Sequence, residues 1–334
     1  MKRVAINGLG RIGRLLLRRY LQVEYKHFTL VAANEPMPAD NLRYLLAYDS
    51  VHGRLDAPVS VENGKLTVGK LSVPLFSETQ PQKLPWGSEQ VDLVIECSGH
   101  FTKRAAAAKH IEAGAGRVLI SAPSADADVI LVMGVNETEY VPERHYVISN
   151  ASCTTNSLAP VLKVLDDEFG IEQASATTIH AYTASQSVVD QAAGKKIRGR
   201  AAALNIIPTS TGADAATIRV LPQLQGRLNA LAVRVPVADG SLSDISAQLK
   251  RSPSVEDVNA AFSAAAHGPL QGILAYSEEE LVSSDIIGDA HSCILHALST
   301  RAQGNLVKVQ VWYDNEFGYA CRCLDLLERV LLNG

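Results

Sequence analysis

The 334-residue sequence has no long apolar run and no surplus of basic residues. No stretch approaches the ~20 apolar residues that a membrane-spanning helix requires, and the N-terminal MKRVAINGLGRIG lacks the apolar segment of a signal peptide. The formal net charge of −4 argues against a nucleic-acid-binding surface, which normally carries excess positive charge. We therefore expect neither a membrane nor a nucleic acid among the partners.

Cysteines are also few. The five present are an odd number, with neither a CxxC pair nor the Cys/His spacing of a zinc site. This pattern predicts reduced thiols in the cytoplasm and no metal centre. A hydrophobic content of 47% and a charged content of 20% are typical of a folded globular protein, and the length suggests about two domains.

Short β-branched runs alternate with helical spacing in the first half of the chain. The runs at 3–8, 28–34, 91–99 and 117–123 predict buried strands, and the apolar spacing over Arg11–Tyr25 predicts a helix. Strands that alternate with helices favour a parallel, doubly wound α/β sheet.

The pattern changes after Ser149. One long helix is predicted over 152–169, followed by alternating strands at 175–183, 230–250 and 306–315, and a final helix over 318–332. Strand-rich segments with fewer helices indicate an α+β domain that contains an antiparallel or mixed sheet.

A glycine-rich turn, NGLGRIG, lies between the first strand and the first helix. Gly8 permits a tight turn, Gly10 permits close approach of a pyrophosphate, and Gly13 permits close packing of helix on strand. Glu35 ends the second strand, where an acid accepts hydrogen bonds from the adenosine ribose and repels a 2′-phosphate. The unit predicts a site for NAD rather than NADP, and a plain βαβ corner is the alternative.

Cys153 stands within SNASCTTN, where hydroxyl and amide side chains surround a single thiol. Apolar positions recur with helical period after it, so the thiol lies in or beside the first turn of a helix. Backbone N–H groups and the helix dipole at that position are expected to lower the thiol pKa. The alternative is a small buried cysteine beside a Ser or Thr cap.

Further residues suit a nucleophilic thiol that handles anions. His180, in the strand TIHAYT, is a candidate base, although many strand histidines are structural. The Thr/Ser/Gly turn at 205–213 is suited to a phosphate. Arg198 precedes that turn, and Arg234 lies within an apolar strand, where it needs an anion or a carboxylate. Structural Arg–Asp pairs are the alternative for each arginine.

Seven motifs together resemble the phosphorylating glyceraldehyde-3-phosphate dehydrogenase family in order and spacing over essentially the whole chain. They are INGLGRIGR, YDSVHGR, SNASCTTN, HAYT, RAAALNIIPTSTGA, VRVP and WYDNEFGY. The resemblance implies an α/β fold with a doubly wound (Rossmann) NAD-binding domain, residues 1–151 and 316–334. It also implies an α+β catalytic domain, residues 152–315, and a homotetramer.

The resemblance assigns a role to each matching position. Cys153 matches the nucleophile and His180 matches the base. The site for the sugar phosphate's terminal phosphate is matched by Thr183, Arg198 and Arg234. The site for the attacking inorganic phosphate is matched by Ser152, Thr154, Thr211 and Gly212. The NAD site is matched by Asn7, Gly8, Gly10, Arg11, Ile12, Gly13, Glu35, Ser98, Ser121, Asn315 and Tyr319.

Three functions remain open at this stage. NAD-dependent phosphorylating oxidation of glyceraldehyde 3-phosphate through a Cys153 thioester is favoured by HAYT and NIIPTSTGA. Glu35 and the longer connection at 23–27 resemble erythrose-4-phosphate dehydrogenase, the sister enzyme. A non-catalytic NAD-binding protein is the third, against which the Cys153 and His180 pair argues. Departures from the family pattern include Ser185 in place of an Asp and a GKKIRGR loop that is one residue short.

Overall fold

The computed structural model describes residues 1–332, which divide into two compact units. The first unit comprises residues 1–131, 137–151 and the chain from 320 onward, and the second comprises 132–136 and 152–319. The last two residues of the C-terminal segment expected in the NAD-binding domain, 333 and 334, lie outside the described part. Within residues 1–332, no helix combines the length and apolar character needed to cross a bilayer.

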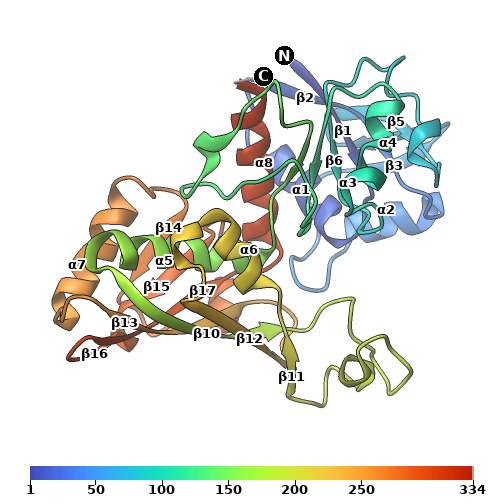
Figure 1. The fold of residues 1–334 in the computed structure, drawn as a ribbon. Coiled ribbons are helices and arrows are strands. Elements are labelled where there is room, and N and C mark those ends of the chain that lie inside the picture. The colour runs from blue at the N-terminus through green and yellow to red at the C-terminus, as the bar shows by residue number, and fades with distance from the viewer. Residues whose placement is uncertain (333–334) are drawn as a thin grey trace. The chain divides into compact units, whose positions relative to one another are not determined.

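The first unit is built on a nine-stranded sheet in the order β3-β4-β5-β2-β1-β6-β7-β9-β8 (Figure 1). The strands are β1 (Lys2–Asn7), β2 (Phe28–Asn34), β3 (Val59–Glu62), β4 (Lys65–Val68), β5 (Leu71–Phe76), β6 (Leu93–Glu96), β7 (Arg117–Ile120), β8 (Val129–Ile130) and β9 (Val147–Ser149). The central pairs run parallel, and only β3-β4-β5 form an antiparallel meander. All four residues of β6 are buried, as expected for a parallel strand covered on both faces. The doubly wound fold is confirmed.

The helices of this unit, apart from the last, lie between strands along the chain. They are α1 (Arg11–Gln22), α2 (Ala39–Ala47), α3 (Arg104–Ala107) and α4 (Lys109–Glu112), together with the part of α8 (Phe317–Leu332) from Ala320 onward. The predicted extension of the first helix to Tyr25 is wrong. Tyr25 lies in the loop after the helix instead and is buried there. Its ring centroid is 5.9 Å from that of Tyr20 and 4.8 Å from that of Phe28.

The second unit contains an eight-stranded mixed sheet in the order β11-β12-β10-β13-β17-β15-β14, with β16 paired to β17. The strands are β10 (Ile171–Ala181), β11 (Ile207–Ser210), β12 (Leu228–Val235), β13 (Ser241–Leu249), β14 (Leu274–Ser277), β15 (Cys293–His296), β16 (Arg301–Gln303) and β17 (Leu306–Tyr313). Pairs β10-β12 and β14-β15 are parallel and the other pairs are antiparallel. The single strand predicted over 230–250 is wrong, because the chain turns at 236–240, where Gly240 has φ +83°.

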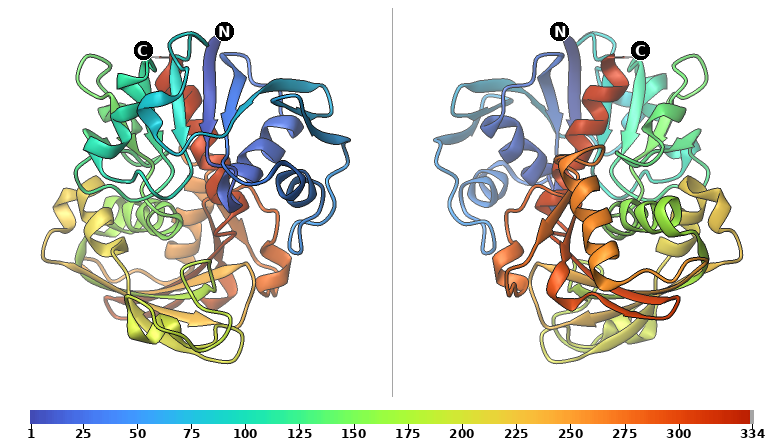
Figure 2. Two further views of the ribbon diagram at one scale, coloured as in Figure 1. Left: turned by 90° about the vertical axis from the view of Figure 1, so that its right-hand side faces the viewer. Right: turned by 90° about the vertical axis from the view of Figure 1, so that its left-hand side faces the viewer.

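Three helices pack with this sheet: α5 (Cys153–Phe169), α6 (Ala213–Val220) and α7 (Val255–His267). Figure 2 shows α5 and α7 side by side. Helix α5 ends at Gly170, with φ +71°, and continues through Pro160 without breaking. Short 3-10 segments occur at Pro81–Lys83, Glu137–Glu139, Lys196–Gly199, Pro222–Leu224, Ser283–Ile286 and Ala297–Ser299.

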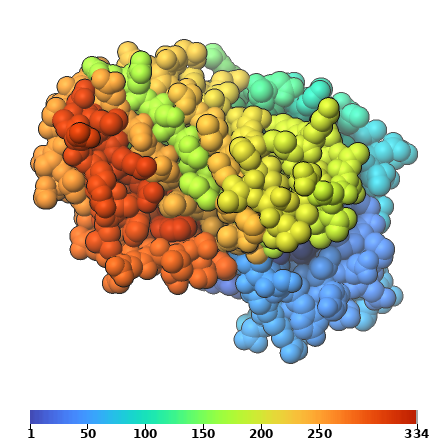
Figure 3. Space-filling view, turned by 90° about the horizontal axis from the view of Figure 1, so that it is seen from below, coloured from blue at the N-terminus to red at the C-terminus, as the bar shows by residue number. Residues whose placement is uncertain are grey.

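The segment 182–206, between β10 and β11, lies on the surface of the second unit. It contains one short 3-10 turn and no strand, and Figure 3 shows it in yellow-green over a broad area. Four apolar side chains in it are 69–83% exposed: Val188, Val189, Leu204 and Ile206. So much exposed apolar surface in one segment is typical of an interaction surface.

Candidate active site

Cys153 is the first residue of α5. Ser152 caps the helix, because its Oγ accepts a hydrogen bond from the Thr155 backbone N–H over 3.0 Å. Ala151, just before the cap, has φ +54°, an uncommon conformation for alanine that turns the chain sharply into the helix. The half-buried thiol therefore lies at the positive end of the helix, as the sequence predicts.

His180 lies near the end of β10, with 3% of its surface exposed. Its Nε2 is 3.5 Å from Cys153 Sγ. The two residues are 27 positions apart, and the fold brings them together because β10 returns along α5. This separation allows direct proton transfer between thiol and imidazole.

The other ring nitrogen of His180 lies between two groups. Nδ1 is 2.7 Å from the carbonyl oxygen of Ala181 and 2.9 Å from Arg234 Nη1. Arg234 Nη1 also donates to the Ala181 carbonyl over 2.9 Å, so it does not depend on the ring for a partner. When Nδ1 carries the proton and donates to Ala181, Nε2 is left to accept the proton of the Cys153 thiol.

Burial and the nearby Arg234 charge lower the pKa of His180 to about 3, so the ring is neutral near pH 7. Burial raises the pKa of the Cys153 thiol, whereas the Arg234 charge and hydrogen bonds from Thr154 lower it. The expectation of a lowered thiol pKa is therefore wrong in direction, because burial outweighs the Arg234 charge and the hydrogen bonds from Thr154. The pair is a neutral thiol beside a neutral base.

Tyr313, at the end of β17, belongs to this candidate site and was not predicted from the sequence. Its buried hydroxyl is 3.1 Å from Thr154 Oγ1 and 2.6 Å from Thr178 Oγ1, and its ring packs edge-on to His180 with centroids 6.0 Å apart. Burial raises the pKa of this phenol, so it stays neutral. A tyrosine at the end of an alternating apolar strand was the only available signal.

Beyond His180, polar groups continue from the ring toward the segment 182–206. Arg234 Nη1 is 3.4 Å from Thr183 Oγ1, which lies 2.9 Å from Ser185 Oγ. Arg198 donates to Ser185 over 3.2 Å and to Thr209 over 3.3 Å. The structure thus brings together two guanidinium groups and several hydroxyls, a combination suited to a phosphate.

Thr211 and Gly212 lie at the start of α6, a helix that packs on α5. Thr211 Oγ1 accepts from the Ala213 backbone N–H over 3.2 Å, and Gly212 is the cap residue. Hydroxyls at the starts of α5 and α6 therefore accompany two sets of helix N-terminal amides, which favour anions. No hydrogen bond described for residues 1–332 joins Thr211 or Gly212 directly to Cys153.

Asn315 is buried just after β17, and its side-chain orientation is fixed. Its Oδ1 accepts from Ser241 Oγ over 2.6 Å, and Ser241 Oγ accepts from the Ala181 backbone N–H over 3.1 Å. With Oδ1 occupied, Nδ2 is the group that Asn315 can offer to a ligand carbonyl. Tyr319 is buried in the first turn of α8.

The glycine turn of the first unit has the predicted geometry. Gly8 has φ +92°, and a Cβ there would lie 2.5 Å from the Ser98 backbone nitrogen. A Cβ at Gly13 would lie 2.0 Å from the Gly8 carbonyl oxygen, which shows how closely helix and turn pack. A Cβ at Gly10 would meet nothing within 4 Å, so this position is open for a ligand to approach.

Glu35 lies beside the glycine turn and accepts hydrogen bonds from two backbone N–H groups. Its Oε2 accepts from the Leu9 backbone N–H over 2.7 Å, and its Oε1 accepts from that of Met37 over 2.9 Å. A cavity of about 440 Å³ adjoins these groups. Its lining includes Asn7, Gly8, Gly10, Glu35, Met37 and Ser98. This is where the sequence places the adenosine end of a dinucleotide.

Three other predicted cofactor residues lie around the same strand ends. Arg11, in the first turn of α1, pairs with Asp49, and Ile12 is half-buried beside it. Ser121 Oγ donates to the Glu96 backbone carbonyl over 3.0 Å. The carboxylate of Glu96 itself was missed by the sequence reasoning, although an acid at the end of an apolar strand is a signal of the same kind as Arg234.

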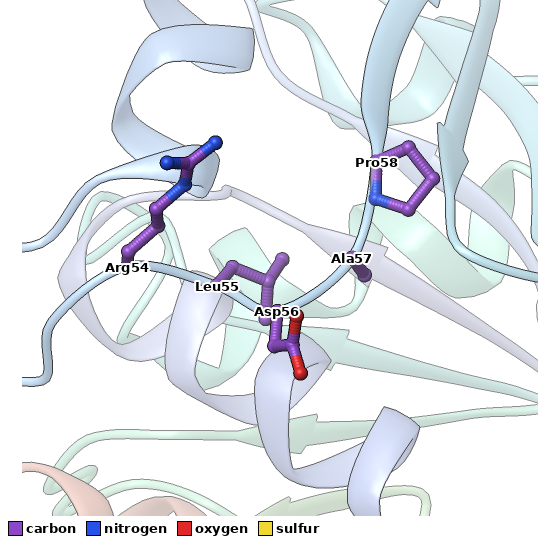
Figure 4. Close-up of a pocket in the computed structure, with 5 residues that line it drawn as sticks. All are labelled: Arg54, Leu55, Asp56, Ala57 and Pro58. Carbon is purple, nitrogen blue, oxygen red and sulfur yellow. The ribbon is translucent and has the colours of Figure 1, made fainter.

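A second hollow in the first unit has a different character. It has a volume of about 540 Å³ and is lined by the consecutive loop residues 54–58 (Figure 4). Of its two charged side chains, Figure 4 shows that of Asp56 on the opposite side of the loop from that of Arg54. It includes none of the predicted site residues, so it is not the candidate site.

Two family models and several known proteins match this chain. The NAD-binding domain model of glyceraldehyde 3-phosphate dehydrogenase matches residues 2–104, and the C-terminal domain model of that enzyme matches residues 152–315. Glyceraldehyde-3-phosphate dehydrogenases of Priestia megaterium and Geobacillus stearothermophilus are each 50% identical over 333 residues, which is 99% of both chains. Glyceraldehyde-3-phosphate dehydrogenase 1 of Bacillus subtilis is equally similar, over the same share.

The fold and these matches define the chain as an NAD-dependent oxidoreductase. It belongs to the glyceraldehyde-3-phosphate dehydrogenase family. The family resemblance and the NAD cofactor predicted from the sequence are confirmed.

Proposed function

We propose that this protein catalyses the NAD-dependent, phosphorylating oxidation of D-glyceraldehyde 3-phosphate to 1,3-bisphosphoglycerate. The observation that carries the proposal is the 3.5 Å distance between Cys153 Sγ and His180 Nε2, with Arg234 beside the ring. A nucleophile, a base and an anion-binding group thus belong to one local arrangement. The relatives' names supply the substrate.

The reaction follows from the proton positions. As Cys153 Sγ attacks the aldehyde carbon, its proton moves to His180 Nε2 and on to the new oxyanion, giving a hemithioacetal. The N–H groups at the start of α5 stabilise the negative oxygen during this step. His180 then removes the hydroxyl proton as hydride leaves the same carbon, giving a thioester. Bound NAD supplies the hydride acceptor.

Inorganic phosphate completes the cycle. A phosphate oxygen attacks the thioester carbonyl, the C–S bond breaks, and the acyl phosphate leaves. His180 returns to the Cys153 sulfur the proton that it took up during hydride transfer. We assign Thr183, Arg198 and Arg234 to the substrate's own phosphate because they form one chain of contacts. The attacking phosphate is assigned to the helix starts, with ligands Ser152, Thr154, Thr211 and Gly212.

The residues around the two proposed parts of the NAD site fit the cofactor. Asn315 Nδ2 is oriented by Ser241 and would donate to the nicotinamide carboxamide oxygen. The turn at Gly8 and Gly10 would hold the pyrophosphate, and Glu35 the adenosine ribose. The proposed NAD site is completed by Arg11, Ile12, Gly13, Ser98, Ser121 and Tyr319.

Erythrose 4-phosphate is the second candidate substrate, because of Glu35 and the longer connection at 23–27. The deciding experiment measures kcat/KM for both aldehydes with saturating NAD and phosphate. We expect glyceraldehyde 3-phosphate to be favoured at least about 10-fold. A ratio that strongly favours the four-carbon sugar would overturn the assignment, and no turnover with either would leave a non-catalytic NAD-binding protein.

We also propose a homotetramer in the cytoplasm. The exposed apolar side chains of segment 182–206, among them Val188 and Leu204, support association with other copies. A reducing compartment suits five cysteines that form no disulfide bond. Sedimentation of the unsubstituted protein and of a Leu204→Asp variant tests the assembly. Leu306→Asp is the control, because it changes another exposed apolar residue. A monomer in the unsubstituted protein would refute it.

A further inference from the structure

Glu96 ends β6 as a buried carboxylate, with 2% of its surface exposed. Its Oε2 accepts from Asn7 Nδ2 over 2.5 Å and lies 2.9 Å from His110 Nε2. Its Oε1 accepts from the backbone N–H of Ser98 over 2.7 Å and from Ser98 Oγ over 2.5 Å. Four groups that donate hydrogen bonds therefore surround this carboxylate.

The proton on His110 is fixed by a second buried side chain. Trp86 Nε1, which can only donate, lies 2.9 Å from His110 Nδ1, so Nδ1 accepts. The neutral ring must then carry its proton on Nε2 and donate it to Glu96. His110 and Trp86 are both fully buried, so neither group has water as an alternative partner.

This cluster reaches the glycine turn through Asn7 and Ser98. Asn7 directly precedes Gly8, and its Oδ1 accepts from Asn34 Nδ2 over 2.7 Å. Gly8 packs so closely on Ser98 that a Cβ would lie 2.5 Å from the Ser98 backbone nitrogen. Glu96 therefore joins the ends of β1 and β6 on either side of the turn, and Asn34 extends the connection to β2.

We propose that Glu96 is a positioning residue for the cofactor, and that Trp86 and His110 orient its carboxylate. Glu96, His110 and Trp86 are not among the residues that line the cavity of about 440 Å³ at the turn, whereas Asn7, Gly8 and Ser98 are. Glu96 acts through those residues because its hydrogen bonds fix the positions of Asn7, next to the turn, and of Ser98. The inference rests on the proposed assignment of this cavity to NAD.

A carboxylate is required here because every neighbour donates. In Glu96→Gln the amide would place its NH2 either against Asn7 and His110 or against Ser98. Each orientation sets an N–H group against another N–H donor, which costs hydrogen bonds in a buried place. We expect the Kd for NAD, measured by titration calorimetry, to rise about 10-fold. The rise in KM for NAD should exceed any fall in kcat at least about 5-fold.

The matched control is Glu112→Gln. Glu112 is an exposed acid on α4, the helix that carries His110, and its substitution should leave NAD binding unchanged. If the unsubstituted protein does not bind NAD, the assignment of the cofactor fails before this inference is tested. If it binds NAD and folded Glu96→Gln binds it equally well, or loses only kcat, the inference about Glu96 is overturned.

A second pair of variants decides the matter if Glu96→Gln does not fold. Glutamine at position 110 can accept from Trp86 and donate to Glu96, whereas leucine can do neither. His110→Leu should weaken NAD binding about 5-fold, and His110→Gln should restore most of that loss. Equal Kd values in the two folded variants would contradict a positioning role, even if their thermal midpoints differ.

Discussion

Arg234 Nη1 lies 2.9 Å from His180 Nδ1, on the side of the ring that faces away from Cys153. The Arg234 charge opposes protonation of the ring, and it also favours the thiolate form of Cys153. One guanidinium group therefore keeps the base able to accept a proton and makes the thiol easier to ionise. We assign the same group to the substrate's phosphate, so binding and activation share a residue.

Arg234→Leu should slow the alkylation of Cys153. Without the cation the thiol pKa rises further, so less thiolate is present between pH 7 and 8 and iodoacetamide, a neutral reagent, should react about 3-fold more slowly. The midpoint of the rate against pH should move upward. Arg251→Leu, an exposed arginine of the same unit, is the control. Alkylation at the unsubstituted rate would show that Arg234 does not influence the thiol.

Cys153→Ser should reduce turnover by about 10⁴-fold or more, because a serine hydroxyl is far less ionised than a thiol near neutral pH. Titration calorimetry should show NAD binding close to that of the unsubstituted protein, since the glycine turn belongs to the other unit. Substantial activity in this variant would exclude a thioester mechanism. Cys293→Ser, at a buried cysteine of the same unit, controls for loss of a thiol alone.

Two glycine substitutions should separate folding from cofactor binding. Gly8→Ala combines φ +92° with a Cβ 2.5 Å from Ser98 N, so we expect a loss of about 2 kcal/mol or more in stability. Gly10→Ala meets nothing within 4 Å, so its thermal midpoint should match that of the unsubstituted protein. Its KM for NAD should nevertheless rise about 10-fold, because the methyl occupies the approach of the pyrophosphate. An unchanged KM in Gly10→Ala would remove Gly10 from the cofactor site.

Most of this candidate site could be predicted from the sequence because its parts carry local signals. Cys153 begins a periodic helix among polar residues, and His180 lies in an alternating strand, so each could be found by itself. Two features depended on burial, which the sequence does not give. The thiol pKa is a sum of opposing effects, and the unpredicted acid Glu96 meets Asn7 across 89 positions of chain.

The division of segment 230–250 into two strands was missed for a different reason. Apolar residues alternate on both sides of the turn, so the period of two continues almost without interruption. Pro236 and Gly240 were the available signals of a break, since proline cannot donate to a ladder and Gly240 has a positive φ. In an alternating run of about 20 residues, proline and glycine therefore predict the strand boundaries better than the periodicity does.

Glu35 should set the preference between the two nicotinamide cofactors. Its carboxylate repels a 2′-phosphate, so Glu35→Ala should narrow the advantage of NAD over NADP in kcat/KM by at least about 10-fold. The lost hydrogen bond to Leu9 N–H weakens both cofactors equally and cancels in that ratio. Glu35→Gln keeps an acceptor oxygen but loses the charge, so it should also reduce the advantage of NAD over NADP. A ratio that does not move would show that another group contacts the ribose.

Asp239→Asn should stabilise the protein, and increasingly so as the pH rises. Asp239 is buried, and burial together with the charges of Asp314 and Glu316 raises its pKa to about 9. Between pH 4 and 9 the folded state keeps a proton that the unfolded state has released, so stability falls with rising pH. Asparagine has the same shape and does not ionise, so it removes this cost. At ~1.4 kcal/mol for each unit of pKa, we expect a gain of several kcal/mol at pH 8 and almost none near pH 4. Thermal midpoints at both values, with the exposed Asp167→Asn as a control, give the comparison. If the difference in thermal midpoint between Asp239→Asn and the unsubstituted protein does not grow with pH, Asp239 is already ionised in the folded protein.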